Sequence, residues 1–190
     1  MIGNDIIDLV QAKKESNWQR PGYLNKLFWP EEQQIIHQSS NQHNMVWSLW
    51  SMKEAVYKAE FRRTMIFEYA PLKVKCLSFN EAHQFLHAEF EYNSIKYFTF
   101  TRVFSSFLHT IACRWKEDFL SLKLIEVEDY PEEYVTYLIM KKFISKNQFI
   151  IKEDNGLPNL VDLNKNSSSP LSISHHGKYL GIIISPFYKI

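Results

Sequence analysis

Apolar residues recur at three- and four-residue steps along residues 44–63, a stretch that contains no Gly or Pro. An α-helix gathers such positions on one side, so the pattern predicts a single amphipathic helix. The members of this apolar stripe are Met45, Leu49, Met52, Val56 and Ala59. We expect the stripe to pack against the remainder of the protein, which would make this helix the element around which the chain is organised.

Glu54, Lys58 and Arg62 follow one another at four-residue steps and therefore share another face of the same helix. One interpretation is a solvated ladder of Glu–Lys pairs, which contributes a few tenths of a kcal/mol per pair. The other is a carboxylate that holds a divalent metal ion while the neighbouring cations neutralise a phosphate chain. The spacing alone does not choose between them.

Residues 1–10 predict a short apolar strand that contains Gly3, Asp5 and Asp8. A glycine inside a strand often marks a bend or a close approach of another backbone. A carboxylate between isoleucines, as at Asp5, is costly unless it lies exposed at a strand end, is paired, or binds a cation. A helix is then expected over residues 27–38, because Pro30 and the acids after it suit a first helical turn.

From residue 72 onward the pattern changes to strands. Residues 72–77 alternate, and aromatic and β-branched stretches follow at residues 85–92, 95–104 and 107–115, separated by short polar breaks. This pattern predicts an antiparallel meander. Further on, we expect strands at residues 120–127, 149–152 and 180–185, a helix at residues 130–146, a turn at residues 154–158 and a polar loop at residues 164–170.

The order helix-then-strands occurs twice, which favours an α+β fold of two similar halves packed as a pseudo-dimer. We place these halves at residues 1–117 and 118–190 and expect one compact unit. The first half holds the Asp and Lys-Glu positions, and the second half holds the Ser-His sequence near the end of the chain.

Composition limits the classes of protein that fit. The 190 residues are 45% hydrophobic and 23% charged, as in an ordinary globular protein, and the net charge of +1 gives no general field for nucleic acid. Cys76 and Cys113 lack metal or redox spacing and are expected to be free thiols. No signal peptide and no apolar run of membrane length is found. We therefore expect a cytoplasmic protein with no membrane and no nucleic-acid partner.

The candidate functional residues are Asp5, the pair Lys53-Glu54, Lys58 and the run Ser174-His175-His176. Adjacent Ser174 and His175 would point to opposite faces of a strand, which is poor for a nucleophilic triad. The adjacent histidines also lack the helical spacing of a zinc pair. Two carboxylates far apart in sequence suit Mg²⁺ better, because that ion keeps few protein ligands.

Four motifs together resemble the 4′-phosphopantetheinyl transferases over nearly the whole chain. They are Gly3-Asn4-Asp5, the helix motif Trp50-Ser51-Met52-Lys53-Glu54-Ala55-Val56-Tyr57-Lys58, the turn Gly156-Leu157-Pro158, and Ser172-Ile173-Ser174-His175. The helix motif is the specific one. Their order is similar to that of the short, trimeric carrier-protein synthases, whereas the length is similar to that of two-lobed members.

The resemblance implies transfer of the phosphopantetheine arm of coenzyme A to a serine of an acyl or peptidyl carrier protein, with release of 3′,5′-ADP. It implies that Asp5 and Glu54 ligate Mg²⁺, that Lys53 and Lys58 hold the pyrophosphate, and that His175 hydrogen-bonds a coenzyme A phosphate. Glu54 or a metal-held water would be the general base, so Asp5, Glu54 and Lys58 form the expected catalytic set. We expect a monomer, with a trimer as the alternative.

Three departures from the family pattern bear on these expectations. Ile7 stands where many two-lobed members have a second acid, with Asp8 one residue further on; Leu157 replaces a lysine; and His176-Gly177 follows His175. Two other classes remain open. A degenerate member could bind coenzyme A or a carrier protein without transfer, and a basic-aromatic nucleic-acid binder is disfavoured by the neutral charge.

Overall fold

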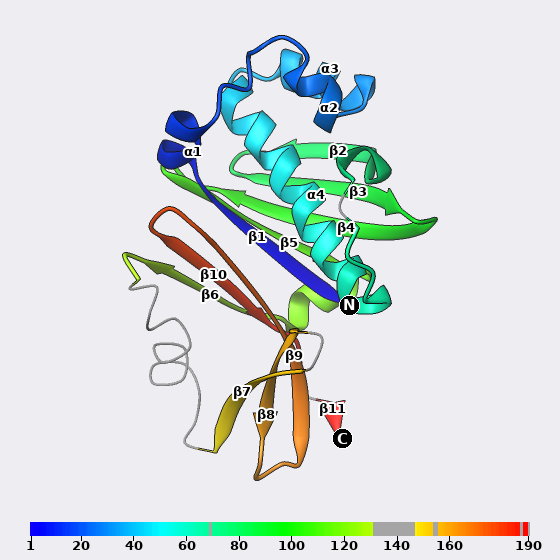
Figure 1. Ribbon diagram of the computed structural model, residues 1–190, viewed down its shortest axis with the longest axis vertical. Coiled ribbons are helices and arrows are strands. Elements are labelled where there is room, and N and C mark those ends of the chain that lie inside the picture. Colours follow the sequence, from blue (N-terminus) through cyan, green and yellow to red (C-terminus); the bar gives the residue numbers. More distant parts are fainter. Residues whose placement is uncertain (69, 131–146, 154–155, 187, 190) are drawn as a thin grey trace.

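The structure is a computed structural model that describes residues 1–68, 70–130, 147–153, 156–186 and 188–189. The chain begins with one strand, β1, and continues through four helices (Figure 1). These elements are β1 (Ile2–Asp8), α1 (Leu9–Glu15), α2 (Tyr23–Leu27), α3 (Pro30–Gln38) and α4 (Gln42–Thr64). The helices expected over residues 27–38 and 44–63 are confirmed as α3 and α4, whereas α1 and α2 were not predicted.

The first sheet is a five-stranded antiparallel sheet with the order β1-β5-β4-β3-β2. After the 3₁₀ turn η1 (Pro71–Lys73), its remaining strands are β2 (Lys75–Ala82), β3 (Phe85–Tyr92), β4 (Ile95–Val103) and β5 (Phe107–Cys113). The predicted antiparallel meander is thus confirmed. Its last strand pairs with β1, which therefore forms one edge of the sheet.

The second sheet follows the 3₁₀ turn η2 (Lys116–Ser121) and has the order β6-β10-β9-β8-β7, with β11 also pairing with β9. Its strands are β6 (Lys123–Glu128), β7 (Gln148–Lys152), β8 (Pro158–Asp162), β9 (Ser167–His176), β10 (Tyr179–Ile184) and β11 (Tyr188–Lys189). In both sheets the first strand in sequence pairs with the last strand of the meander. Residues 131–146 of the expected helix and residues 154–155 of the expected turn lie outside the described residues.

The polar loop predicted at residues 164–170 is wrong from Ser167 onward, because β9 begins there. Ser167 pairs with Asp162 and Pro170 pairs with Asn159, so the neighbouring strand β8 supplies the backbone hydrogen bonds that keep this segment extended. Small serine side chains are then buried on the sheet, including Ser167 and Ser169. Tertiary pairing outweighs the weak strand preference of serine.

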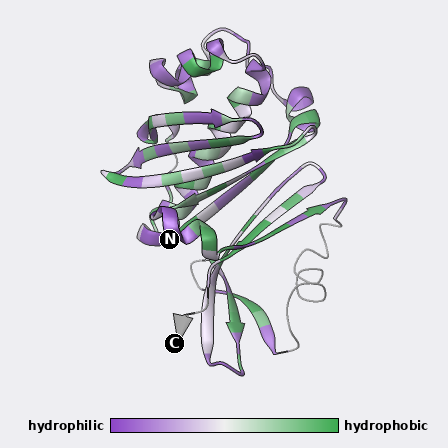
Figure 2. Cartoon of the chain, turned by 180° about the vertical axis from the view of Figure 1, so that it is seen from behind, coloured by the Kyte–Doolittle hydropathy of each residue, from purple (hydrophilic) through white to green (hydrophobic). Residues whose placement is uncertain are grey.

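The core lies between α4 and one face of the first sheet (Figure 1). All five residues of the predicted apolar stripe are at most 3% exposed. Burial of such a side chain contributes about 1.5–3 kcal/mol. Figure 2 shows hydrophobic and hydrophilic segments alternating along the strands of the first sheet, as expected for a sheet whose two faces have different surroundings.

The two sheets meet where the free edge of β1 faces side chains of β9. The backbone N–H groups of Asn4 and Ile6 donate to Ser172 Oγ and Ser174 Oγ, both at 3.2 Å, and the Asp8 N–H donates to His176 Nδ1 at 3.0 Å. Alternate residues of a strand project to the same face, which explains why the three acceptors on β9 are two residues apart. The β1 edge is thereby satisfied by side chains from the second sheet.

Candidate functional site

A close approach of α4 to β1 creates the site, and Gly3 permits it. A Cβ atom at Gly3 would lie 2.1 Å from the Ala55 carbonyl oxygen and 2.6 Å from the Ala59 backbone nitrogen. Both atoms belong to the helix backbone and cannot move aside. Only glycine fits here, so the first motif glycine has a packing reason.

Asp5 follows two residues later on the same strand and is 7% exposed. Its Oδ1 accepts hydrogen bonds from Lys58 Nζ at 2.9 Å and from Ser174 Oγ at 3.0 Å. Its Oδ2 is buried and has no hydrogen-bond partner within the described parts of the chain. Of the three possibilities left open for this carboxylate, the structure shows burial with a paired cation, and its second oxygen is buried without a described hydrogen-bond partner.

Glu54 and Lys58 lie one turn apart on α4, and both are partly buried. Ser51 Oγ donates to the Asp5 backbone carbonyl at 3.3 Å, so Asp5 lies beside the helical turn that carries Glu54. The Glu54 carboxylate also affects Tyr57. Burial raises the pKa of the Tyr57 hydroxyl, and the negative charge of Glu54 raises this pKa further. Lys58 contacts both Asp5 and Ser174, and Glu54 lies one helical turn before Lys58 on α4. We call Asp5, Glu54, Lys58 and Ser174 the Asp5 cluster.

Arg62 continues this face toward the second sheet. Its guanidinium donates to the Pro158 carbonyl at 3.0 Å, to the Leu171 carbonyl, and to Asn159 Oδ1 at 3.2 Å. Burial lowers the pKa of Arg62, and Glu153 opposes this shift. The interpretation as a solvated ladder is therefore wrong for Lys58 and Arg62, because both contact the second sheet.

Lys53 is fully buried in a different place. Its ammonium forms an ion pair with Glu32 Oε2 at 2.6 Å and donates to the carbonyls of Pro71 at 3.1 Å and Val74 at 2.9 Å. Burial lowers the pKa of Lys53, and the Glu32 charge opposes the shift. The structure therefore does not bring Lys53 to Lys58. Lys53 instead joins α4 to α3 and to the start of the first meander.

Asp8 caps α1 and is not part of the Asp5 cluster. Its Oδ1 accepts from the backbone N–H groups of Val10 at 2.9 Å and Gln11 at 3.0 Å, and its Oδ2 accepts from the Lys178 N–H at 3.4 Å. A Cβ atom at Gly177 would lie 2.4 Å from this Oδ2, so the glycine in the β9–β10 turn admits the carboxylate. The cap also explains why α1 begins directly after β1.

The two neighbouring histidines have separate surroundings. His176 Nδ1 accepts from Asp8, which leaves Nε2 to donate to Glu15 Oε2 at 3.1 Å. A hydrogen bond from Gln11 and this one from His176 lower the pKa of Glu15. His175 is exposed, lies near the Tyr130 ring, and projects from the face of β9 opposite to Ser174. The structure therefore does not bring His175 into the Asp5 cluster.

The Asp5 cluster fits a hard divalent cation better than zinc. Within the described ranges no group of three or more His, Cys, Asp or Glu side chains surrounds a possible metal position. The carboxylates of Glu54 and of Asp5, whose Oδ2 is buried without a described partner, are ligands of the type that Mg²⁺ prefers, and this ion is commonly held by one or two carboxylates with water and phosphate oxygens completing the shell.

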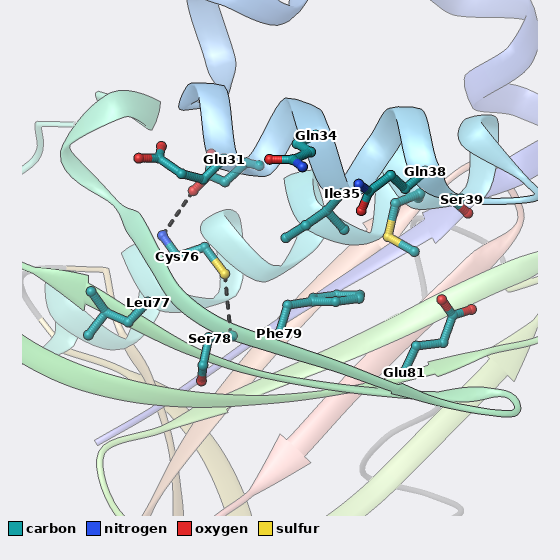
Figure 3. A pocket seen from close by; sticks show the side chains of 12 residues that line it. Glu31, Gln34, Ile35, Gln38, Ser39, Cys76, Leu77, Ser78, Phe79 and Glu81 are labelled. Atoms are coloured by element: carbon teal, nitrogen blue, oxygen red, sulfur yellow. Dashed lines mark hydrogen bonds between the residues drawn. The ribbon is translucent and has the colours of Figure 1, made fainter.

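A groove of about 580 Å³ lies elsewhere, between α3 and β2 (Figure 3). Glu31, Ile35 and Phe79 are among its lining residues, and that lining includes none of the Asp5 cluster. None of the described helices is both long and apolar enough to cross a membrane.

The family model of the 4′-phosphopantetheinyl transferase superfamily matches residues 1–112, which is more than half of the 190 residues. The chain belongs to this superfamily. The match supports a transferase of the phosphopantetheinyl kind, and it covers Asp5, Glu54 and Lys58. Ser174 and His175 lie beyond the matched residues. The comparison with curated proteins finds no match.

Proposed function

We propose that this phosphopantetheinyl transferase moves the 4′-phosphopantetheine group of coenzyme A to a serine of an apo carrier protein, with Mg²⁺ as cofactor. The observation that carries the proposal is the buried Asp5 carboxylate, which has one oxygen fixed by Lys58 and Ser174 and the other buried without a described hydrogen-bond partner. A buried carboxylate oxygen without a partner is costly, and a bound cation would remove that cost.

In the proposed reaction the carrier serine oxygen forms a bond to the β-phosphorus of coenzyme A, and the bond from this phosphorus to the bridging pyrophosphate oxygen breaks. The serine proton goes to the general base, and 3′,5′-ADP leaves. Asp5 and Glu54 would hold Mg²⁺, which supplies charge neutralisation at the pyrophosphate. Lys58, whose side chain is 31% exposed, adds a cation that can reach the same phosphates. Glu54 is the proposed base, directly or through a water.

The other expected binding residues enter the proposal differently. Lys53 is occupied by Glu32 and two carbonyls, so we assign it to packing and not to the pyrophosphate. His175 is exposed, which leaves it accessible to a coenzyme A phosphate at the rim of the site. Leu157 is buried directly before β8 and has no charge, so it does not replace the positive charge of the lysine that is common at this position.

The proposed partner is an acyl or peptidyl carrier protein, and the proposed active form is a monomer. A single chain brings Asp5 and Ser174 together across its two sheets, so no second copy is needed for this cluster. The shared strand order of the sheets supports a pseudo-dimer of two similar halves, which we propose to be residues 1–117 and 118–190. The cytoplasmic location stays a prediction from the sequence.

A non-catalytic relative that binds coenzyme A or a carrier protein is the second candidate. Retention of Asp5, Glu54 and Lys58, which form the expected catalytic set, disfavours it.

The test is intact-protein mass spectrometry of several apo carrier proteins incubated with this protein, coenzyme A and Mg²⁺. We expect a phosphopantetheine mass increase on at least one carrier, lost with EDTA and lost in the Asp5→Ala and Glu54→Ala variants, each with wild-type circular dichroism. Wild-type turnover in either variant would refute the metal-ligand assignment. No mass increase on any carrier, beside a permissive transferase that modifies them all, would favour the non-catalytic relative.

A further inference from the structure

We propose that Ser174 is a positioning residue, supplied by the second sheet, that fixes Asp5 so that its Oδ2 is presented to the metal ion. This inference rests on the proposed function, because it assigns a task to a residue that touches a proposed metal ligand. Ser174 lies on β9, beyond the residues that the family match covers.

The hydrogen bonds of the Ser174 hydroxyl can be assigned completely. A hydroxyl has one hydrogen to donate and two lone pairs to accept with. The Ile6 N–H at 3.2 Å and Lys58 Nζ at 3.1 Å can only donate, so both lone pairs are filled. The hydroxyl hydrogen must then go to Asp5 Oδ1 at 3.0 Å. Ser174 therefore has a fixed orientation, and it donates to the carboxylate.

This arrangement restricts the Asp5 side chain. Lys58 and Ser174 both donate to Oδ1 from different elements, which opposes rotation of the carboxylate about its Cβ–Cγ bond. Oδ2 remains buried without a described partner. Hydrogen bonds to the non-ligating atoms of a metal ligand orient that ligand, and their loss typically weakens metal binding about 10–100-fold.

Ser172 provides a matched control on the same strand. Its Oγ accepts from the Asn4 N–H at 3.2 Å, the same kind of bond at the same distance as that from Ile6 to Ser174. Both serines are buried. Ser174 differs in also contacting Asp5 and Lys58. If both serines only stabilised the fold, Ser172→Ala and Ser174→Ala would have the same effect on metal affinity.

The experiment measures Mn²⁺ affinity, by electron paramagnetic resonance of the free ion, for the wild-type protein and the variants Ser174→Ala, Ser174→Thr and Ser172→Ala. We expect Ser174→Ala to weaken Mn²⁺ binding about tenfold, Ser174→Thr to retain most of the affinity through its hydroxyl, and Ser172→Ala to stay within about twofold of the wild type. Thermal unfolding of each variant confirms that the comparison is between folded proteins.

Equal Mn²⁺ affinities for the two alanine variants would overturn the positioning role, as would a wild-type protein that binds no Mn²⁺. The carrier assay separates this from the proposed function. Mn²⁺ binding that depends on Ser174, together with no transfer to any carrier, would refute the proposed activity and support the positioning role. Transfer that is equally efficient in Ser174→Ala and the wild type at limiting Mg²⁺ would refute the positioning role and support the activity.

Discussion

Gly3 shows how a single residue without a side chain sets the geometry of the site. Its missing Cβ lets the Ala55 and Ala59 backbone approach β1, and Lys58 then reaches Asp5 from the same stretch of helix. The sequence predicted either a bend or a close backbone approach at Gly3, because a glycine inside a strand often marks one of these. It could not identify α4 as that backbone, since the contact joins segments far apart in the chain.

We expect Gly3→Ala to lower the free energy of unfolding by about 3 kcal/mol, the upper end of the usual cost of overpacking, because an added methyl group would overlap the helix backbone. Gly22→Ala is the control: no atom lies within 4 Å of its Cβ position, and only the left-handed backbone, with φ of 76°, opposes the change. That strain costs about 1–2 kcal/mol. Urea unfolding checks both values, and similar losses for the two variants would contradict the packing argument.

Lys53 and Lys58 lie five positions apart on α4 and have different tasks. We expect Lys58→Met to abolish transfer while the protein remains folded, because its partly exposed ammonium serves the site. Lys53→Met should lower the free energy of unfolding by about 3–5 kcal/mol, since it leaves the Glu32 carboxylate buried without its cation.

The measurement for both lysine variants combines urea unfolding with carrier modification at a temperature where each variant is folded. Transfer by folded Lys53→Met should stay close to that of the wild type. A large loss of activity in Lys53→Met without a loss of stability would return Lys53 to the pyrophosphate site, as the family resemblance implied.

The sequence could place Lys58 better than Lys53 or Ser174 for a simple geometric reason. Glu54 and Lys58 are four residues apart and share a helical face, whereas Lys53 directly precedes Glu54 and lies about 100° around the helix. The role of Ser174 depends on β1, which is distant in sequence. A signal was present, however, since Ser172, Ser174 and His176 alternate as residues on one face of a strand do.

Among the elements, α4 was predictable and β9 was only partly so. The periodicity of α4 arises within one segment, and its apolar stripe is buried as expected. The first residues of β9 are serines followed by a proline, which locally favour a loop, and only pairing with β8 makes them a strand. Local patterns therefore predict an element that is determined by its own residues, and they fail for one that is determined by its neighbours.

The helix α1 offers a test of whether Asp8 contributes to the metal site. Its carboxylate caps the helix through two backbone N–H groups, so Asp8→Ala should lower the free energy of unfolding by about 1 kcal/mol. Asp8→Ser should recover most of this loss, because serine caps helices well and is a poor metal ligand. Mn²⁺ affinity should be the same in both variants. A common loss of affinity would instead place Asp8 in the metal shell.

At the scale of the whole molecule, the two sheets have the same strand order, and both have a long connection between their first and second strands. In the first sheet this connection contains the helices α1 to α4. The helix predicted from sequence over residues 130–146 falls in the corresponding connection of the second sheet. The pseudo-dimer stays a prediction, and the shared topology supports it.

The sheets are held together at α4 by Arg62, which donates to two backbone carbonyls and a side-chain oxygen of the second sheet. We expect Arg62→Ala to increase amide hydrogen exchange in β8 and β9, because these strands lose their attachment to the helix, and the Pro158 and Leu171 carbonyls lose a charged donor. Each lost bond of this kind costs about 1.5–3 kcal/mol. Exchange in β3 and β4 should change little.

Arg63→Ala is the control, because Arg63 pairs with Glu60 on the same helix at 2.6 Å and none of the hydrogen bonds described for it reaches the second sheet. It should leave the exchange of β8 and β9 unchanged. If both variants accelerate exchange equally in both sheets, the lobes unfold as one cooperative unit and Arg62 has no special part in joining them. If only Arg62→Ala loosens the second sheet, and transfer falls with it, then the orientation of Ser174 toward Asp5 depends on this attachment as well as on the β1 edge.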